Sequence, residues 1–240
     1  MRLLAIDTSN QPLSVATAED DTALAALSTN TKNTHGESLM PAISTLMDMT
    51  PFGMKEVDRI VISKGPGSYT GLRIGATTAK TLAWTLKKEL VAVSSLALIA
   101  ANYTGTSDYI VPLFDARRGN IYTGLYQYED ERLKNIEADT HIEASVFAES
   151  LKNYEGNFVL VGTDAHKHID TFQEVLGDRV KIAPSYNHLP RASVLAQMGR
   201  KLEPIDIHTF EPDYLKLTEA EENWLADHPN EGDTSYVEEV

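Results

Sequence analysis

The chain has 240 residues, no cysteine and a formal net charge of −14. The lack of cysteine excludes disulfides, thiolate metal sites and cysteine nucleophiles. No stretch approaches the roughly 18 consecutive apolar residues of a membrane span, and an acid at position 7 comes too early for a signal peptide. The sequence therefore predicts a cytoplasmic globular protein without a membrane association, and its acidity disfavours stand-alone binding to nucleic acid.

The acidic charge is concentrated at the C-terminal end. Residues 218–240 contain eight acids and neither lysine nor arginine, so the rest of the chain has a net charge of only −6. Such a composition is typical of a solvated end, and we expect this segment to be partly disordered or to pack as a short helix.

Hydrophobic periodicity in the first part of the chain predicts three short strands, followed by alternating helices and strands. Turn residues at 8–12 and 19–21 separate the strands. Between them and the next strand, the apolar residues recur at helical spacing, and Pro41 is acceptable because it lies near the helix start. The predicted elements are strands 3–6, 13–17 and 22–27, helix 37–49, strand 59–63, helix 70–86, strand 90–94 and helix 95–102.

The second part of the chain repeats this order of elements with different residues. A polar, turn-rich stretch at 103–108 is suited to a hinge between the two parts. We therefore expect an α/β protein with lobes at 1–104 and 105–217, each a mixed sheet with the order β-β-β-α-β-α-β-α and covering helices. The second set comprises strands 109–114, 120–126 and 134–142, helix 144–152, strand 158–161, helix 166–176, strand 179–182 and helix 190–202.

A glycine-rich turn between strand 59–63 and helix 70–86 is the most distinctive motif. Four glycines lie within residues 65–75, and Ser68 or Thr70 would cap the helix, which leaves backbone N–H groups for a phosphate. The spacing fits neither a Walker loop nor the dinucleotide pattern. An alternative is close packing, because Gly71, Gly75 and Ala79 recur every four residues and line one face of the helix.

Two further features bear on a nucleotide or metal site. Asp7-Thr8-Ser9 ends the first strand, where it could face a phosphate or its metal, but the same residue types stabilise turns without a ligand. No histidine pair has the helical i, i+4 spacing of a metal site, since Leu39 stands four residues after His35. We therefore expect no metal site.

Several strings of the sequence together resemble those of the TsaB family. They are Asp7-Thr8-Ser9, His35 with Ser38-Leu39, Lys64 to Gly75, Ser94-Ser95-Leu96, Asp115 to Gly119 and Pro212 to Leu215. The resemblance covers residues 1–217 and implies a two-lobed fold similar to actin-like ATPases and sugar kinases. It also implies a function in placing threonylcarbamoyl on adenosine 37 of tRNAs that read codons beginning with A.

The resemblance implies that this chain is a non-catalytic relative of the transferase TsaD and binds it through the first lobe. It further implies homodimers through much the same surface, a complex joined by the ATPase TsaE, and tRNA contact through the complex. The transferase carries a His-x-x-x-His metal pair on the corresponding helix, and Leu39 replaces its second histidine here. The expected contact residues are His35, Leu39, Met40, Ile43, Leu46, Met47, Gly71, Ile74, Gly75, Thr78, Ala79 and Leu82.

Two alternatives remain open at this point. One is a nucleotide-using or peptidase-like enzyme, although the turn at 115–119, Asp-Ala-Arg-Arg-Gly, replaces the glycine-rich phosphate turn of an active kinase lobe. The other is direct tRNA contact by Arg117 and Arg118, which the net charge disfavours. We expect no required cofactor and only weak binding of ATP or ADP, and the candidate vestigial nucleotide site comprises Asp7, Thr8, Ser9, Gly65, Gly67, Ser68, Thr70 and Gly71.

Overall fold

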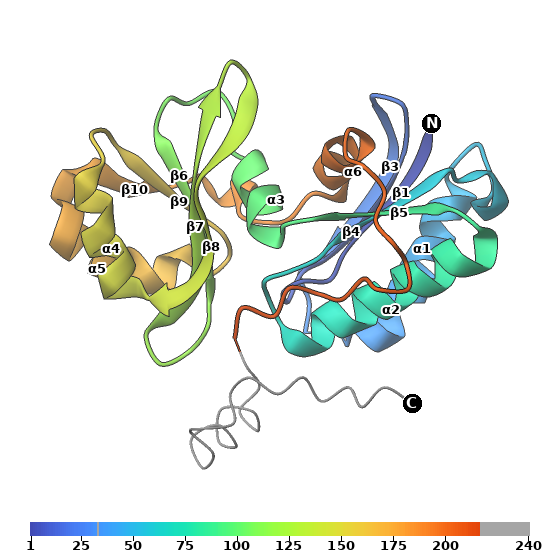
Figure 1. The fold of residues 1–240 in the computed structure, drawn as a ribbon, viewed down its shortest axis with the longest axis horizontal. Helices are drawn as coiled ribbons and strands as arrows, with labels where there is room; N and C mark the ends of the chain where they lie inside the picture. Colours follow the sequence, from blue (N-terminus) through green and yellow to red (C-terminus); the bar gives the residue numbers. More distant parts are fainter. Residues whose placement is uncertain (33, 217–240) are drawn as a thin grey trace, which may run out of the picture.

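The computed structural model describes residues 1–32 and 34–216. It contains two lobes, each built on a five-stranded mixed sheet (Figure 1). The predicted order of strands and helices is confirmed in both lobes. The predictions for residues 217–240, including the acidic tail, lie outside the described residues. None of the helices in the described part is both long and apolar enough to cross a membrane.

The first lobe has the strand order β3-β2-β1-β4-β5. β1 pairs antiparallel with β2 and parallel with β4, so the sheet is mixed. The side chains of β1 alternate between two cores: Leu4 and Ile6 pack under α1 and α2, whereas Leu3 and Ala5 face α6. The elements of this lobe are β1 (Arg2–Asp7), β2 (Leu13–Glu19), β3 (Thr22–Thr29), α1 (His35–Asp48), η1 (Met54–Glu56), β4 (Arg59–Ser63), α2 (Tyr69–Leu86) and β5 (Glu89–Val93).

The second lobe has the strand order β10-β9-β6-β7-β8, the same pattern as the first. One face of its sheet is covered by α4 and α5 around Phe147, Phe158 and Phe172, all of which are buried. Its elements are β6 (Tyr109–Asp115), β7 (Asn120–Glu129), β8 (Arg132–Glu143), α4 (Ala144–Ser150), η2 (Leu151–Asn153), β9 (Phe158–Val161), α5 (Ala165–Leu176), η3 (Gly177–Arg179), β10 (Val180–Ile182) and η4 (Ser185–Asn187).

The two remaining helices, α3 (Ser95–Ala101) and α6 (Ala192–Arg200), are exchanged between the lobes. α3 follows β5 of the first lobe but packs Leu96, Ile99 and Ala100 against the second sheet. α6 follows the second lobe but packs against the first sheet, where the backbone N–H of Ala192 donates to Ser14 Oγ at 3.0 Å. The spatial division of the molecule therefore differs from a division of the sequence near residue 104.

Residues 203–216, which we call the C-terminal strap, run back along the first lobe (Figure 1). The N–H of Ile205 donates to the carbonyl of Leu90, and the N–H of Asp213 donates to that of Lys64, each at 2.8 Å. Phe210 is buried in the core beneath α2. The strap thereby joins β5, α2 and the glycine-rich turn.

Candidate functional site

The glycines of α2 let the helix pack directly on the end of β1. A Cβ at Gly71 would lie 2.2 Å from the carbonyl oxygen of Thr8, and one at Gly75 would lie 2.3 Å from Thr8 Oγ1. The hydroxyl of Thr8 donates to the carbonyl of Gly71 at 2.8 Å. Ala79 is also fully buried. The prediction that a partner helix packs closely on Gly71, Gly75 and Ala79 is therefore wrong. Residues of the same chain already pack against this small-residue face of α2.

Three of the predicted contact residues on α1 are also internal. Leu39, Ile43 and Leu46 are at most 1% exposed and belong to the core between α1 and the first sheet. They cannot contact a partner unless the lobe opens, so their assignment to the partner surface is wrong. The helical spacing was correct, but it identified the core-facing side of α1.

The other predicted contact residues lie on the outer part of the α1–α2 layer. Met40 is 50% exposed, and a Cβ added at Gly36 would lie 3.9 Å from Ile74 Cδ1, so the two helices meet here. Partly exposed uncharged side chains from both helices make up what we call the two-helix surface, and these are Met40, Met47, Ile74, Thr78 and Leu82. His35, the remaining predicted contact residue, lies at the start of α1 beside an interlobe pocket.

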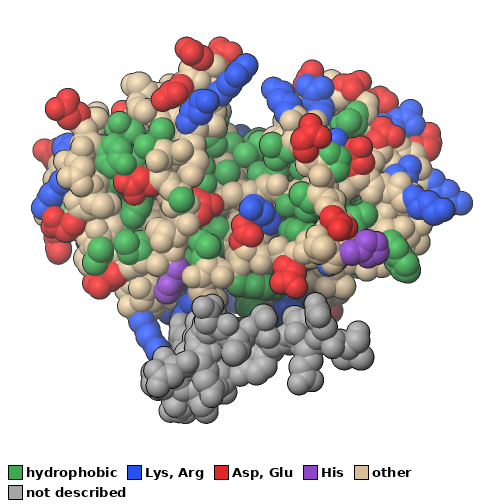
Figure 2. All heavy atoms as spheres, viewed as in Figure 1, with side chains coloured by type: hydrophobic (Ala, Val, Ile, Leu, Met, Phe, Trp, Pro, Cys, Tyr) green, Lys and Arg blue, Asp and Glu red, His purple; other side chains and the backbone are tan. Residues whose placement is uncertain are grey.

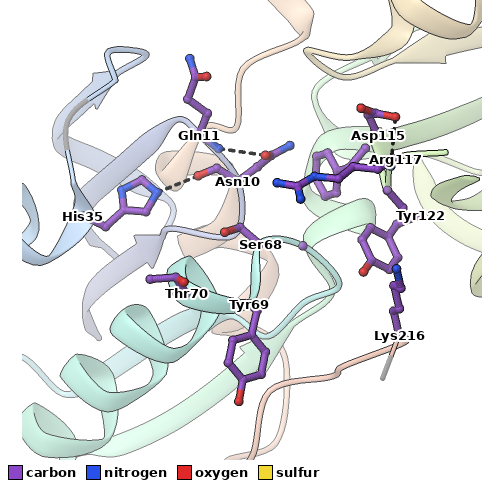
Figure 3. A pocket seen from close by; sticks show the side chains of 13 residues that line it. Asn10, Gln11, His35, Ser68, Tyr69, Thr70, Asp115, Arg117, Tyr122 and Lys216 are labelled. Atoms are coloured by element: carbon purple, nitrogen blue, oxygen red, sulfur yellow. Dashed lines mark hydrogen bonds between the residues drawn. The ribbon is translucent and has the colours of Figure 1, made fainter. Parts of the chain in front are cut away.

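The interlobe pocket has a volume of about 540 Å³ and is formed by loops of both lobes (Figure 3). Hydrophobic side chains also show in the hollow between the lobes on the face drawn in Figure 2. The first lobe supplies the β1–β2 turn and the start of α2, and the second supplies the β6–β7 turn. The lining residues are Asn10, Gln11, His35, Gly67, Ser68, Tyr69, Thr70, Phe114, Asp115, Ala116, Arg117, Tyr122 and Lys216.

On the first-lobe side, hydrogen bonds within the protein fix the polar groups of the pocket. His35 Nε2–H donates to the carbonyl of Asn10 at 2.8 Å, and the N–H of Gln11 donates to Asn10 Oδ1 at 2.9 Å (Figure 3). Ser68 caps α2 by accepting a long hydrogen bond from the N–H of Gly71. His35 thus holds the β1–β2 turn in place through its Nε2 atom.

On the second-lobe side, Asp115 organises the turn to β7. Its Oδ1 accepts hydrogen bonds from the N–H of Arg117 at 3.3 Å and from His168 Nε2 at 3.2 Å, and Lys167 Nζ lies 3.5 Å from its Oδ2. Burial raises the pKa of Asp115, but these donors and charges together hold it below its ordinary value. Arg117 points from this turn toward the first lobe (Figure 3), and its own backbone is left-handed, with φ at 67°.

Asp7 lies outside the lining of the interlobe pocket, although its position suggested a phosphate or metal ligand. Its side chain is fully buried, accepts a short hydrogen bond from Ser63 Oγ and accepts another from the N–H of Ser9. Burial raises the pKa of Asp7 above its ordinary value. Its geometry is that of a residue that braces the ends of β1 and β4, which is the turn-stabilising alternative considered for Asp7-Thr8-Ser9.

Replacing Asp7 with asparagine is expected to make the protein progressively more stable than the unmodified chain as the pH rises above about 4. Because the pKa of Asp7 is raised in the folded state, the stability that its protonated carboxyl contributes is lost as the pH rises. Asparagine does not titrate, so the variant does not lose this stability. Urea unfolding of both proteins between pH 4 and pH 8 tests this. A variant that loses stability at neutral pH would show instead that the ionised carboxylate is the favoured form.

The residues of the candidate nucleotide site are only partly brought together. Gly67, Ser68 and Thr70 line the pocket, whereas Asp7, Thr8, Ser9, Gly65 and Gly71 do not. Sequence reasoning did not select Asn10, Gln11, Tyr122 or Lys216 as lining residues. Asn10 and Gln11 could have been found, because they continue the polar turn that begins at Thr8. Lys216 could not, since its place depends on the path of the C-terminal strap.

Groups of three or more histidine, aspartate or glutamate side chains with metal-binding geometry are absent from residues 1–32 and 34–216. Two positions of α1 correspond to the His-x-x-x-His metal pair of the transferase. At these positions Leu39 is part of the core, and His35 Nε2 is hydrogen-bonded to a backbone carbonyl.

Comparisons with known proteins agree on one family. A family model described as "TsaD: tRNA N6-adenosine threonylcarbamoyltransferase" matches residues 27–224. The tRNA threonylcarbamoyladenosine biosynthesis protein TsaB of Bacillus subtilis (strain 168) is 42% identical, over 94% of this chain and 98% of its own length. The protein of the same name from Escherichia coli (strain K12) is 26% identical, over 90% and 95% of the two chains.

The fold also matches a solved structure. A protein from Pseudomonas aeruginosa, described as similar to peptidase YeaZ, superposes with a TM-score of 0.77 at 24% identity, covering 90% of this chain and 99% of that one. The expected two-lobed α/β fold, with a mixed sheet in each lobe, is thereby confirmed. On the 42% identity over nearly the whole chain, this protein belongs to the TsaB family of tRNA threonylcarbamoyladenosine biosynthesis proteins.

Proposed function

We propose that this chain is a non-catalytic subunit that supports threonylcarbamoylation of adenosine 37 in tRNA by binding a TsaD-type transferase through its two-helix surface. The family membership supports the pathway. The match to the transferase family model supports a partner with a related fold, because two related lobes can pair across equivalent helices. In this proposal the chain works in the cytoplasm, where the ATPase TsaE joins the complex and tRNA is contacted through it.

The observation that carries the proposal is that both α1 and α2 expose apolar side chains on the two-helix surface. Met40, Met47, Ile74, Thr78 and Leu82 are partly or largely exposed, and none of them is ionisable. Exposed apolar side chains that come from two neighbouring helices are typical of a surface that becomes buried in a complex. Methionine side chains adapt to differently shaped partners, which agrees with one surface that serves both a homodimer and a heterodimer.

Replacing Met40 and Ile74 together with aspartate is expected to weaken transferase binding by about 100-fold or more, because two carboxylates would be desolvated in an apolar contact. Titration calorimetry of the purified proteins measures the loss. The matched control is Val146→Asp, which places a carboxylate at a 52% exposed apolar position on α4 of the other lobe. Full affinity of the double variant, or an equal loss in the control, would refute docking at this surface.

A second candidate function, nucleotide binding, is favoured by the interlobe pocket alone. The pocket offers the start of α2, the amide side chains of Asn10 and Gln11, and the guanidinium of Arg117. Against strong binding, Asp7 is buried outside the pocket and Asp115 is already engaged by neighbouring donors. We therefore propose that no nucleotide is required for the scaffold function.

Calorimetric titration of the chain with ATP and Mg²⁺ is expected to show no binding tighter than a Kd of about 1 mM. This Kd corresponds to a binding free energy of about −4 kcal/mol. Arg117→Ala serves as the control, because a genuine weak signal from the pocket should fall further when this guanidinium is removed. Micromolar binding that Arg117→Ala abolishes would favour the nucleotide-using alternative.

A further inference from the structure

The charges of α2 differ in sign from those of the chain as a whole. Its two charged residues are Arg73 and Lys80, and Lys87 caps its C-terminal end. The three follow one another at intervals of seven residues, which is nearly two helical turns, so they run along one side of the helix. We call Arg73, Lys80 and Lys87 the basic stripe; it lies on a helix without an acid in a protein whose net charge is −14.

The charges of the basic stripe are not neutralised by the residues that contact them. Arg73 Nη1 donates to the hydroxyl of Tyr69 at 2.9 Å, and Lys80 Nζ donates to the carbonyl of Phe210 at 2.8 Å. These acceptors carry no charge. Within the part of the chain that the structure describes, none of the three cations forms an ion pair with a carboxylate within 4.0 Å. Glu211 is an acidic residue that lines the same surface groove as Arg73 and Lys80.

A groove beside the basic stripe offers room for a segment of chain. It has a volume of about 310 Å³ between α2 and the strap, and Arg73, Lys80 and Tyr214 are among the residues that line it. Trp84 stands next to the stripe on the helix surface and is 66% exposed. A large aromatic side chain left open beside unneutralised cations is typical of a surface that another segment covers.

We infer that residues 217–240 of the same chain dock on α2 through the basic stripe and cover Trp84. The segment has eight acids and neither lysine nor arginine, and its apolar residues include Trp224 and Leu225. The negative charge of the segment is thus complementary to the positive charge of the basic stripe. An acidic second copy of the chain or a nucleic acid would also be complementary in charge, but neither would be tethered to α2.

The point from which the segment leaves favours an intramolecular contact. Tyr214 lies against Tyr69, the first residue of α2, with the ring centroids 5.0 Å apart. Only two further residues are described before position 217, so the segment begins at one end of the stripe. Its 24 residues can extend about 80 Å, whereas an 18-residue helix is about 27 Å long. Tethering gives an effective concentration of about millimolar, so weak charge pairs suffice.

Quenching of Trp84 fluorescence by acrylamide tests the inference in the full-length chain. The chain has two tryptophans, so Trp224→Phe leaves Trp84 as the sole signal and keeps an aromatic ring in the segment. At about 0.01 M salt, Trp84 is expected to be shielded, and the quenching constant should rise by roughly twofold at about 1 M salt, where the Debye length falls to about 3 Å. The same rise in the quenching constant is expected at low salt in two variants. One changes Glu219, Glu221 and Glu222 to glutamine, and the other changes Arg73 and Lys87 to glutamine.

The matched control is Lys134→Gln, which removes an exposed charge from β8 of the other lobe and should leave the quenching constant unchanged. Equal quenching in all variants at all salt concentrations would overturn the inference. Shielding that appears only as the protein concentration is raised would also overturn it, because a second copy would then be covering α2. These measurements involve no transferase, so they stand apart from the proposed function.

Discussion

Replacing Gly75 with leucine is expected to lower the free energy of unfolding by about 3 kcal/mol or more. Even the first added carbon would lie 2.3 Å from Thr8 Oγ1 and 3.1 Å from Ile62 Cδ1, so α2 would have to move away from the first sheet. Chemical denaturation followed by circular dichroism measures the loss, and a large effect would appear as poor recovery of folded protein. Loss of partner binding in this variant would therefore report unfolding and not the removal of a contact.

Gly36→Ala is the matched control for Gly75, because it makes the smallest version of the same change on the neighbouring helix. The added carbon would meet only Ile74 Cδ1, at an ordinary 3.9 Å. Its stability should be unchanged or higher by up to about 1 kcal/mol, since alanine favours a helix over glycine. A Gly75→Leu protein as stable as Gly36→Ala would contradict the packing of α2 on Thr8.

Replacing Arg59 with alanine is expected to cost about 3 kcal/mol. Arg59 is 6% exposed, and its Nη1 donates to the carbonyls of Gly199, Arg200 and Leu202 at 2.8 to 3.0 Å, where α6 ends. Its Nε also donates to Glu89 at 2.8 Å. Removing the guanidinium leaves the last carbonyls of α6 without a cation and releases the exchanged helix from the first sheet.

Two variants separate this role of Arg59 from a general loss of charge. Arg200→Ala removes an arginine of α6 that pairs with the exposed Asp21, and it should cost no more than about 1 kcal/mol. Arg59→Lys keeps the charge but not the planar fork, so it should fall between alanine and the native residue. Urea unfolding of the three proteins gives the comparison, and equal values for Arg59→Ala and Arg200→Ala would contradict the account.

The elements of the fold could be predicted from local sequence, but their pairing across the molecule could not. Strand β4 and helix α2 were found at nearly their observed ends, because apolar runs, glycine turns and helical spacing act locally. Nothing local distinguishes α3 or α6 from the other helices. Their exchange depends on which sheet face is left uncovered, and this is a property of the complete fold.

The candidate site was less predictable, because a helical pattern gives spacing but not direction. Gly71 and Gly75 form a small-residue face that could have met either a partner or the chain's own β1, and the structure shows the second. Asp7 stands at the right end of β1 for a ligand, yet its hydrogen bond with Ser63 turns it inward. Met40 and Ile74 were selected with Leu39 and Ile43, and only burial separates the outer pair from the core pair.

The proposed scaffold function and a catalytic alternative require different parts of the molecule. Docking requires the two-helix surface to remain uncharged, and it does not require the carboxylate of Asp7. An enzyme that resembles an active nucleotide-using relative would require a carboxylate at the end of β1 and would tolerate charges on the outer helices. The two accounts therefore predict opposite results for the same pair of variants.

The most direct test measures threonylcarbamoyladenosine in tRNA from cells that lack the native protein and express either variant. With expression levels matched by immunoblot, Asp7→Asn is expected to restore the modification, and Met40→Asp with Ile74→Asp is expected to leave it near the level of depleted cells. Restoration by the two-helix variant and failure of Asp7→Asn would contradict a non-catalytic scaffold that acts through α1 and α2.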